Sequence, residues 1–268
     1  MNPSLAPSET PAAREPPVIG TIHAIPLSEL HPMPCSPFQI REDAAMVDLI
    51  DSVQQYGVLI PAEVRPRPEG GYEIISGARR KHASELANLE SMPAIIRDLD
   101  DDEAIIRMVD SNFQRENTLP SERARAFKMR MEAAKRKAGR PRKEEKENAP
   151  KISANFRSDD AVGELAGVSG DTVRNLISLT QLVPELMQMV DEKKIALTPA
   201  YQIAALPENK QKLLLETIDS EQATSSLSQA QRMRKLSQSG EISSIFLTLS
   251  MKPQVASCPE IQSGTLRL

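Results

Sequence analysis

A glycine followed by two arginines stands where a strand-like segment gives way to a helical one. The strand-like run Tyr72–Ser76 ends at Gly77, and Arg79 and Arg80 then open a helical pattern. A glycine at such a junction lets the backbone approach a ligand closely, and the first N–H groups of the new helix point toward that ligand. Because guanidinium groups add charge-assisted donors for phosphate oxygens, the pattern predicts a phosphate-binding turn. Taken alone, it also fits a solvated helix start.

A second polar motif follows at the end of a separate helical segment. It contains Asn112 and Arg115, so it adds a carboxamide and another guanidinium group. The two motifs in this order favour a phosphate-containing ligand over a solvated helix start.

Residues 159–178 fit a helix-turn-helix template. Gly167 occupies the turn, where a positive φ is needed, and Gly163 is small enough for the second helix to cross the first. Ser169 and Asp171 are suitable N-caps for the second helix. The apolar positions expected to hold the unit together are Val162, Leu165, Ala166, Val168, Val173 and Leu176. Any two-helix corner satisfies this apolar pattern, so the outward-facing residues carry the functional argument.

Those outward-facing residues are suited to DNA. Arginine and asparagine make paired hydrogen bonds to guanine and adenine edges, and serine and threonine suit phosphates. We therefore predict that the second helix reads DNA, although the pattern does not rank Arg174 against Asn175 as the residue that touches a base. The residues predicted to contact DNA here are Ser169, Gly170, Thr172, Arg174, Asn175 and Ser178.

A strongly basic segment precedes this unit. The whole chain has a net charge of −4, which at first sight argues against nucleic acid. Between residues 123 and 143, however, ten Lys and Arg residues accompany one acid, Glu132, which gives a local charge of +9. A DNA backbone responds to this local potential. A solvated helix face is the alternative. The predicted backbone contacts are made by Lys135, Arg136, Lys137 and Arg140.

The composition favours helix-rich domains in a reducing compartment. The 268 residues leave room for two modest domains and a tail, and the 3% aromatic content without Trp requires an aliphatic core. Cys35 and Cys258 match no metal spacing, so we expect no metal site. Residues 1–17 lack the apolar core of a signal peptide, and no apolar run is long enough to span a bilayer. We expect a cytoplasmic protein without a membrane partner.

Strand-like and helical patterns alternate in the first part of the chain, and helical patterns dominate the second. We expect strands near 18–25, 62–65, 72–76 and 94–97, and helices at 46–56, 77–88 and 102–112. The acidic run at 98–103 fits a helix N-terminus better than a metal site, because carboxylates are stabilising there. The expected organisation is a leader at 1–17, an α+β domain at 18–119, a basic helix and linker at 120–157, a helix-turn-helix domain at 158–240 and a tail of unknown structure at 241–268.

The order of these motifs resembles the ParB partition-protein family. The matching segments are Pro37–Arg41, Tyr56–Pro61, Gly71–Arg80, Met92–Ile96 and Asn112–Glu116, and the resemblance continues to about residue 240. It implies an α+β N-terminal domain of the ParB/sulfiredoxin-like type followed by an all-α helix-turn-helix domain. It also implies a homodimeric clamp that binds a centromere-like DNA site, uses CTP with Mg²⁺ and works with a ParA-type ATPase in plasmid or chromosome segregation.

The same resemblance implies which residues hold the nucleotide. The turn at Gly77 would bind the triphosphate, the second motif would complete the pocket, and the segment around Gln39 would cover it. The implied set is Gln39, Arg41, Gly77, Ala78, Arg79, Arg80, Asn112, Gln114 and Arg115.

Two positions depart from the family pattern. Ala78 and Ser111 stand where the family usually has glutamate, and Asp110 precedes Ser111. Serine cannot act as a base at neutral pH, so the sequence predicts CTP binding and leaves weak hydrolysis open. Sulfiredoxin-like enzymes share the small fold but carry a cysteine at the position of Ala78, which makes redox chemistry a poor fit. A transcriptional regulator or nucleoid-occlusion factor on the same scaffold remains the alternative.

Overall fold

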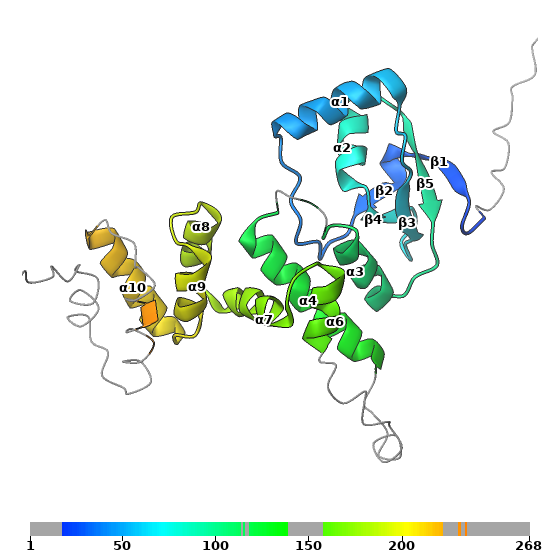
Figure 1. Cartoon of the computed structure of the whole chain (residues 1–268). Coiled ribbons are helices and arrows are strands. Elements are labelled where there is room, and N and C mark those ends of the chain that lie inside the picture. The colour runs from blue at the N-terminus through cyan, green and yellow to red at the C-terminus, as the bar shows by residue number, and fades with distance from the viewer. Residues whose placement is uncertain are drawn as a thin grey trace, which may run out of the picture. The chain divides into compact units, whose positions relative to one another are not determined.

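The computed structural model of the chain describes residues 18–113, 115, 118–138, 158–221, 230, 231 and 234 (Figure 1). The chain divides into two compact units. Unit 1 comprises Met1–Glu116 and Met129–Ala154, and unit 2 comprises Asn117–Lys128 and Asn155–Leu268. The division falls within helix α4 (Pro120–Ala138). Gln114, Arg140 and the tail at 241–268 lie outside the described residues.

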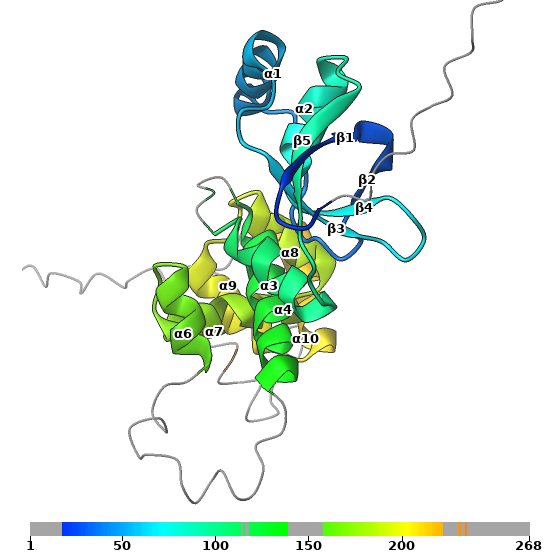
Figure 2. The same ribbon diagram turned by 90° about the vertical axis from the view of Figure 1, so that its right-hand side faces the viewer.

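A five-stranded mixed sheet forms the centre of unit 1 (Figure 2). Its strands are β1 (Ile22–Pro26), β2 (Leu30–Pro32), β3 (Ala62–Pro66), β4 (Tyr72–Ser76) and β5 (Ser91–Ile96). They lie in the order β1-β5-β3-β4-β2, with parallel pairs β3–β5 and β2–β4 and antiparallel pairs β1–β5 and β3–β4. The strand expected from residue 18 begins only at residue 22, because a turn occupies 19 and 20. The short strand β2 was not expected from the sequence.

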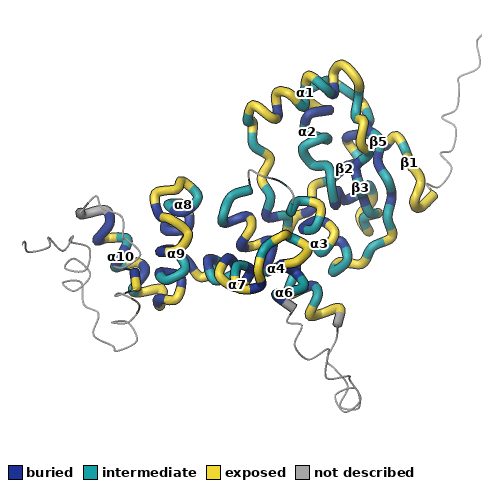
Figure 3. The backbone as a smooth tube through the Cα atoms, in the orientation of Figure 1, coloured by how far each residue is buried: buried dark blue, intermediate teal, exposed yellow. Residues whose placement is uncertain are grey.

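The apolar core of unit 1 lies along the middle strands. Val64 pairs with Ile74 on one side and Ile96 on the other, and all three are buried. Helices α1 (Ala44–Tyr56) and α2 (Ala78–Leu86) pack against each other through a second buried cluster that includes Met46, Val53 and Ala83. The outer face of α1 is exposed (Figure 3). Both helices therefore present only one apolar face, as the sequence periodicity requires.

Helix α3 (Asp101–Asp110) begins with a capping box. The backbone N–H of Glu103 donates to Asp100 Oδ1 at 2.7 Å, and the N–H of Asp100 donates to Glu103 Oε2 at 3.4 Å. Acids also fill the next positions of the first turn, where the helix dipole favours negative charge. The expectation that this acidic run starts a helix is confirmed.

Unit 2 is helical throughout its described part. After the first half of α4 come α6 (Ser158–Leu165), α7 (Gly170–Ser178), the short 3₁₀ turn η3 (Leu179–Gln181), α8 (Pro184–Asp191), α9 (Leu197–Ala204) and α10 (Glu208–Glu221). An α+β unit followed by an all-α region confirms the predicted fold class. Among the described residues, no helix is long and apolar enough to cross a membrane.

A buried glutamine ties three segments of unit 2 together. Gln211 is 1% exposed. Its Nε2 donates to the carbonyls of Gln181, at 3.0 Å, and Leu206, at 2.9 Å, and its Oε1 accepts from the N–H of Val183 at 2.8 Å. One side chain thus satisfies backbone groups at the end of η3, before α8 and before α10.

Replacing Gln211 with alanine should lower the free energy of unfolding of unit 2 by roughly 2–4 kcal/mol, because two buried backbone groups and one partly buried carbonyl lose their partner. Gln188→Ala on the exposed face of α8 is the matched control and should change stability by less than about 0.5 kcal/mol. Urea unfolding of the full chain followed by circular dichroism measures both. Equal effects of the two substitutions would contradict this role of Gln211.

Candidate nucleotide-binding turn and DNA-reading helices

The turn between β4 and α2 requires glycine for two reasons. Gly77 has φ 114° and ψ 15°, in the left-handed region that side chains disfavour. A Cβ atom at this position would also lie 2.9 Å from the Cβ of Ala62 on β3. The backbone therefore passes directly over the neighbouring strand, and α2 starts with its first N–H groups at this turn.

Arg80 connects this turn to the loop before β3. Its Nη1 donates to the carbonyls of Ile60 and Pro61, both at 2.6 Å, and its Nη2 lies 3.5 Å from Ser76 Oγ. Burial lowers the pKa of Arg80, and the nearby Glu63 carboxylate opposes that shift. The guanidinium group is thus already anchored by backbone carbonyls of the chain.

Arg79 connects the same turn to the start of α1. Its Nη2 donates to Asp43 Oδ1 at 3.0 Å, and that carboxylate also accepts the N–H of Met46 at 2.9 Å as the N-cap of α1. The hydrogen bond from Arg79 lowers the pKa of Asp43. A partly exposed ion pair with Asp43 therefore holds Arg79 near the turn.

The second motif forms its own contact at the end of α3. Arg115 Nη1 donates to Asn112 Oδ1 at 3.1 Å, and Asn112 Nδ2 donates to the carbonyl of Met108 at 2.8 Å. Helix α3 packs against β4, the strand that ends at Gly77. Gln39 is exposed and Arg41 half-buried in the segment before α1. The structure thus joins Asn112 to Arg115, while Gln114 lies outside the described residues.

The two side chains that could replace the family's glutamate have partners within the chain. Asp110 accepts from Arg130 Nε at 2.6 Å and from Arg130 Nη2 at 3.3 Å. The hydroxyl of Ser111 donates to the carbonyl of Met108 at 2.9 Å. Sequence reasoning considered Asp110 for its position and missed Arg130, which lies twenty residues further on.

Helices α6 and α7 form the expected crossing. Gly167 has φ 67°, which confirms the positive φ predicted for the turn. A Cβ at Gly163 would lie 2.5 Å from the carbonyl oxygen of Val168, so glycine is needed where the chain turns back. Ser169 caps α7, with its Oγ accepting the N–H of Thr172 at 3.2 Å. Val173 is fully buried.

Two positions of this unit differ from the sequence prediction. Leu165 is 62% exposed, so its assignment to the inner face was wrong. It is the last residue of α6, and the chain leaves the helix there for the turn. Gly170 was expected to face outward but is buried, because the start of α7 packs against Asp160 of α6.

Arg174 is held by two carboxylates from two helices. Its Nη1 donates to Asp159 Oδ2 at the start of α6, and its Nη2 donates to Asp171 Oδ1 in the first turn of α7. The neighbouring Asn175 is exposed, and Ser178 Oγ donates to the Asn175 carbonyl at 2.6 Å. Asp159 was missed by sequence reasoning, since its partner lies fifteen positions away on another helix.

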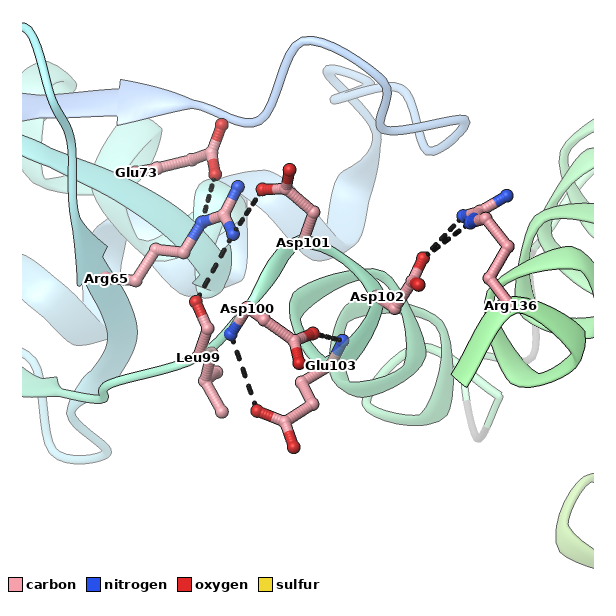
Figure 4. Close-up of polar contacts among 8 residues, drawn as sticks. All are labelled: Arg65, Glu73, Leu99, Asp100, Asp101, Asp102, Glu103 and Arg136. Carbon is pink, nitrogen blue, oxygen red and sulfur yellow. Dashed lines mark hydrogen bonds and ion pairs between the residues drawn. The ribbon is translucent and has the colours of Figure 1, made fainter. Parts of the chain in front are cut away.

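The basic end of α4 is partly neutralised by the first turn of α3. Arg136 Nη2 lies 2.6 Å from Asp102 Oδ1, and Lys137 pairs with Glu103. These hydrogen bonds raise the pKa of both basic groups. Figure 4 shows the acidic turn between Arg136 on one side and Arg65 on the other. Lys135 is exposed, and Arg140 lies outside the described residues.

This geometry describes a helix-turn-helix protein with an attached α+β unit that has a glycine turn at a helix N-terminus. Two family models agree with it: the ParB N-terminal domain matches residues 12–113 and the ParB HTH domain matches residues 151–238. The chain belongs to the ParB family.

Three similar proteins illustrate the relationship. The chromosome-partitioning protein Spo0J of Thermus thermophilus is 29% identical over 171 residues, which are 64% of this chain and 55% of that protein. A nucleoid occlusion protein of Halalkalibacterium halodurans is 26% identical over 200 residues, 74% of this chain and 63% of that protein. This chain spans less than two thirds of the length of both relatives. A crystal structure of the C-terminally truncated chromosome-partitioning protein ParB from Caulobacter crescentus complexed with CTP-gamma-S is 26% identical and covers 75% of this chain and 99% of that chain, with a TM-score of 0.34.

Gly77→Ala should destabilise unit 1 by about 2–3 kcal/mol, because it combines the strain of a positive φ with the close contact to Ala62. Gly70→Ala is the control in the same unit, since Gly70 has φ 93° and open space around its Cβ position. It should cost only about 1–2 kcal/mol, the strain alone. Thermal unfolding of the full-length variants measures the difference. A smaller loss for Gly77→Ala than for Gly70→Ala would contradict the close packing described here.

Proposed function

We propose that this chain is a sequence-specific DNA-binding partition protein that binds a centromere-like site and forms a CTP-gated clamp for plasmid or chromosome segregation. The observation that carries the proposal is the presence, in one member of the ParB family, of both a glycine-led helix N-terminus suited to phosphate and a helix-turn-helix. The first part supplies the nucleotide site and the second the DNA site. Ligand binding would then favour a closed state of a homodimer.

The nucleotide proposal rests on the turn at Gly77. The first N–H groups of α2 are free of intrahelical partners in any helix and carry partial positive charge, so they suit phosphate oxygens. Arg79 adds a charged donor that is paired with the partly exposed Asp43. Arg80, in contrast, is anchored to the carbonyls of Ile60 and Pro61, and we assign it to shaping the pocket wall. CTP with Mg²⁺ is the ligand that the family resemblance implies.

We infer binding without efficient hydrolysis. A general base must offer a lone pair to the attacking water, within hydrogen-bond reach. Asp110 already accepts two hydrogen bonds from Arg130, and the Ser111 hydroxyl is directed to a backbone carbonyl. Ala78 offers no acid or base. These contacts support a protein that holds CTP and hydrolyses it weakly at most.

The DNA proposal rests on α7 and on the basic end of α4. The exposed Asn175 and the held Arg174 are the base-reading candidates, and Ser169, Thr172 and Ser178 would contact phosphates. Lys135, Arg136 and Lys137 would contribute contacts that do not depend on sequence, together with Arg140. A ParA-type ATPase is the implied partner in segregation, and association with a nucleoid or plasmid follows from DNA binding.

A transcriptional regulator or nucleoid-occlusion factor is the second candidate. The similarity to a nucleoid occlusion protein favours it, and such a factor would use the same scaffold. The distribution of binding sites separates the two functions. Sites clustered near an origin of replication favour partition, whereas scattered or promoter-proximal sites favour the second candidate.

Calorimetry with CTP and with ATP, both with Mg²⁺, tests the nucleotide site. The wild type should bind CTP selectively, and Arg79→Ala should weaken CTP binding roughly tenfold or more through loss of a charge-assisted hydrogen bond. Asp43→Asn is the control, because it removes the ion pair of Arg79 but keeps a side chain that can cap α1. It should retain CTP binding. DNA binding without any CTP binding would favour the second candidate.

Neutralising the acidic turn should strengthen non-specific DNA binding. The double variant Asp102→Asn/Glu103→Gln releases Arg136 and Lys137 for phosphate contacts, and we expect several-fold tighter binding to random-sequence DNA with a steeper salt dependence. Asp48→Asn/Asp51→Asn on the exposed face of α1 makes the same change in net charge. Fluorescence anisotropy across a salt series measures both variants. Equal gains would mean that net charge alone is responsible.

A further inference from the structure

The side chain of Arg174 combines an anchor and an exposed end. Asp159 is only 8% exposed, and its carboxylate accepts from Arg174 Nη1 across the contact between α6 and α7. The Arg174 side chain nevertheless remains 41% exposed. Two carboxylates occupy only part of the donor set of a guanidinium group, so N–H groups remain available on its solvent side.

The burial of Asp159 makes its contact with Arg174 persistent. A carboxylate removed from water is costly unless a cation or several donors compensate it, and Arg174 is the cation that does so here. An arginine on the surface of a helix otherwise loses rotamer freedom when it binds a ligand. Because Asp159 already restricts Arg174, DNA binding has less side-chain freedom to remove.

The exposed acid beside Arg174 indicates which part of DNA this edge of α7 faces. The side chain of Asp171 is 81% exposed and lies one helical turn before Arg174. It would be repelled by a phosphate, whereas a carboxylate can accept a hydrogen bond from the N4 amino group of cytosine. Guanidinium N–H groups in turn match the O6 and N7 acceptors of guanine. Together the two side chains suit the base edges of a G·C-containing step rather than the backbone.

We propose that Asp159 is a positioning residue that holds Arg174 for guanine readout, with Asp171 accepting from a cytosine amino group at the same or the adjacent base pair. The inference rests on the proposed DNA-binding function and names the bases that α7 reads. Asn175 lies next in the chain, is exposed and reads a separate base, for which adenine is the chemical match. Loss of Asp159 then changes the discrimination at the Arg174 base pair and leaves the Asn175 base pair unaffected.

The test begins with a DNA site enriched by the wild-type full-length chain from a random-sequence duplex pool. Competition binding to every single-base variant of that site then gives a preference profile for each protein. Arg174→Ala should lose about tenfold of the preference at one G·C pair. Asp159→Asn should lose several-fold of the preference at the same pair and keep both the remaining profile and the salt dependence. Adding Asp159→Asn to Arg174→Ala should cause no further loss of preference, because the positioned group is already gone.

Two further variants separate positioning from helix packing. Glu164→Gln removes an exposed acid from the same helix and should leave the whole profile unchanged. Arg174→Lys keeps a cation for Asp159, so it should stay folded, yet it should lose guanine preference because an ammonium lacks the planar fork. Thermal unfolding confirms that each variant is folded at the assay temperature.

The outcomes also separate this inference from the proposed function. A folded Arg174→Ala or Arg174→Lys variant with the wild-type profile at every position would show that Arg174 only joins α6 to α7, which overturns the inference. Uniform weakening at all positions by Asp159→Asn would do the same. In both cases the wild type has still enriched a site, so sequence-specific binding stands. A wild-type chain that enriches no site contradicts the proposed function itself.

Discussion

The close passage of Gly77 over β3 is the constraint on which the candidate nucleotide site depends. With a left-handed φ and a Cβ position only 2.9 Å from Ala62, the chain can leave β4 and begin α2 without an intervening loop. Because α2 begins there, Arg79 reaches the N-cap of α1 and Arg80 reaches the carbonyls before β3. One backbone turn therefore positions three segments that are distant in sequence. The first N–H groups of α2 lie where these segments meet.

The arginines of the candidate sites divide into two groups by the burial of their partners. Backbone carbonyls hold Arg80, and the buried carboxylate of Asp159 holds Arg174. Removing either arginine would leave its partner without a hydrogen-bond donor, which costs free energy. Arg136, by contrast, pairs with an acid at an exposed surface, and such pairs contribute little because water and salt compete with them. A buried partner keeps the guanidinium group of the first kind of arginine in one orientation. An arginine of the second kind can exchange its carboxylate partner for a phosphate. The sequence analysis predicted binding roles for arginines of both groups.

Local patterns in the sequence predicted the features that depend on local physics. The strand-to-helix junction at Gly77, the acidic start of α3 and the positive φ of Gly167 all follow from glycine conformation, helix dipoles or capping. The alternation of strands and helices likewise predicted the α+β unit. The short strand β2 was not predicted, because three residues that include a proline show too little periodicity to indicate a strand.

Features that depend on tertiary contacts were not predictable in the same way. The exposed Leu165 fits the apolar spacing of an inner face, yet it is the last residue of α6, where the chain leaves the helix for the turn. Several of the carboxylates that hold the arginines are also remote in sequence: Asp102 lies 34 positions from Arg136. Sequence periodicity assigns a residue to a face of its own helix but does not say which other helix meets that face. The role of these acids therefore appears only once the helices are placed.

The end of α3 shows how such a contact bears on chemistry. The resemblance to the family implies a glutamate where Ser111 stands, and the neighbouring Asp110 is the residue that could replace it. In the structure, Arg130 donates two hydrogen bonds to that carboxylate, and the Arg130 side chain is itself only 11% exposed. Moving Asp110 toward a water molecule would leave a poorly solvated cation without its partner, which costs more than a single new hydrogen bond returns. The ion pair that joins α4 to α3 thus also engages the carboxylate that the sequence offers in place of the family's glutamate.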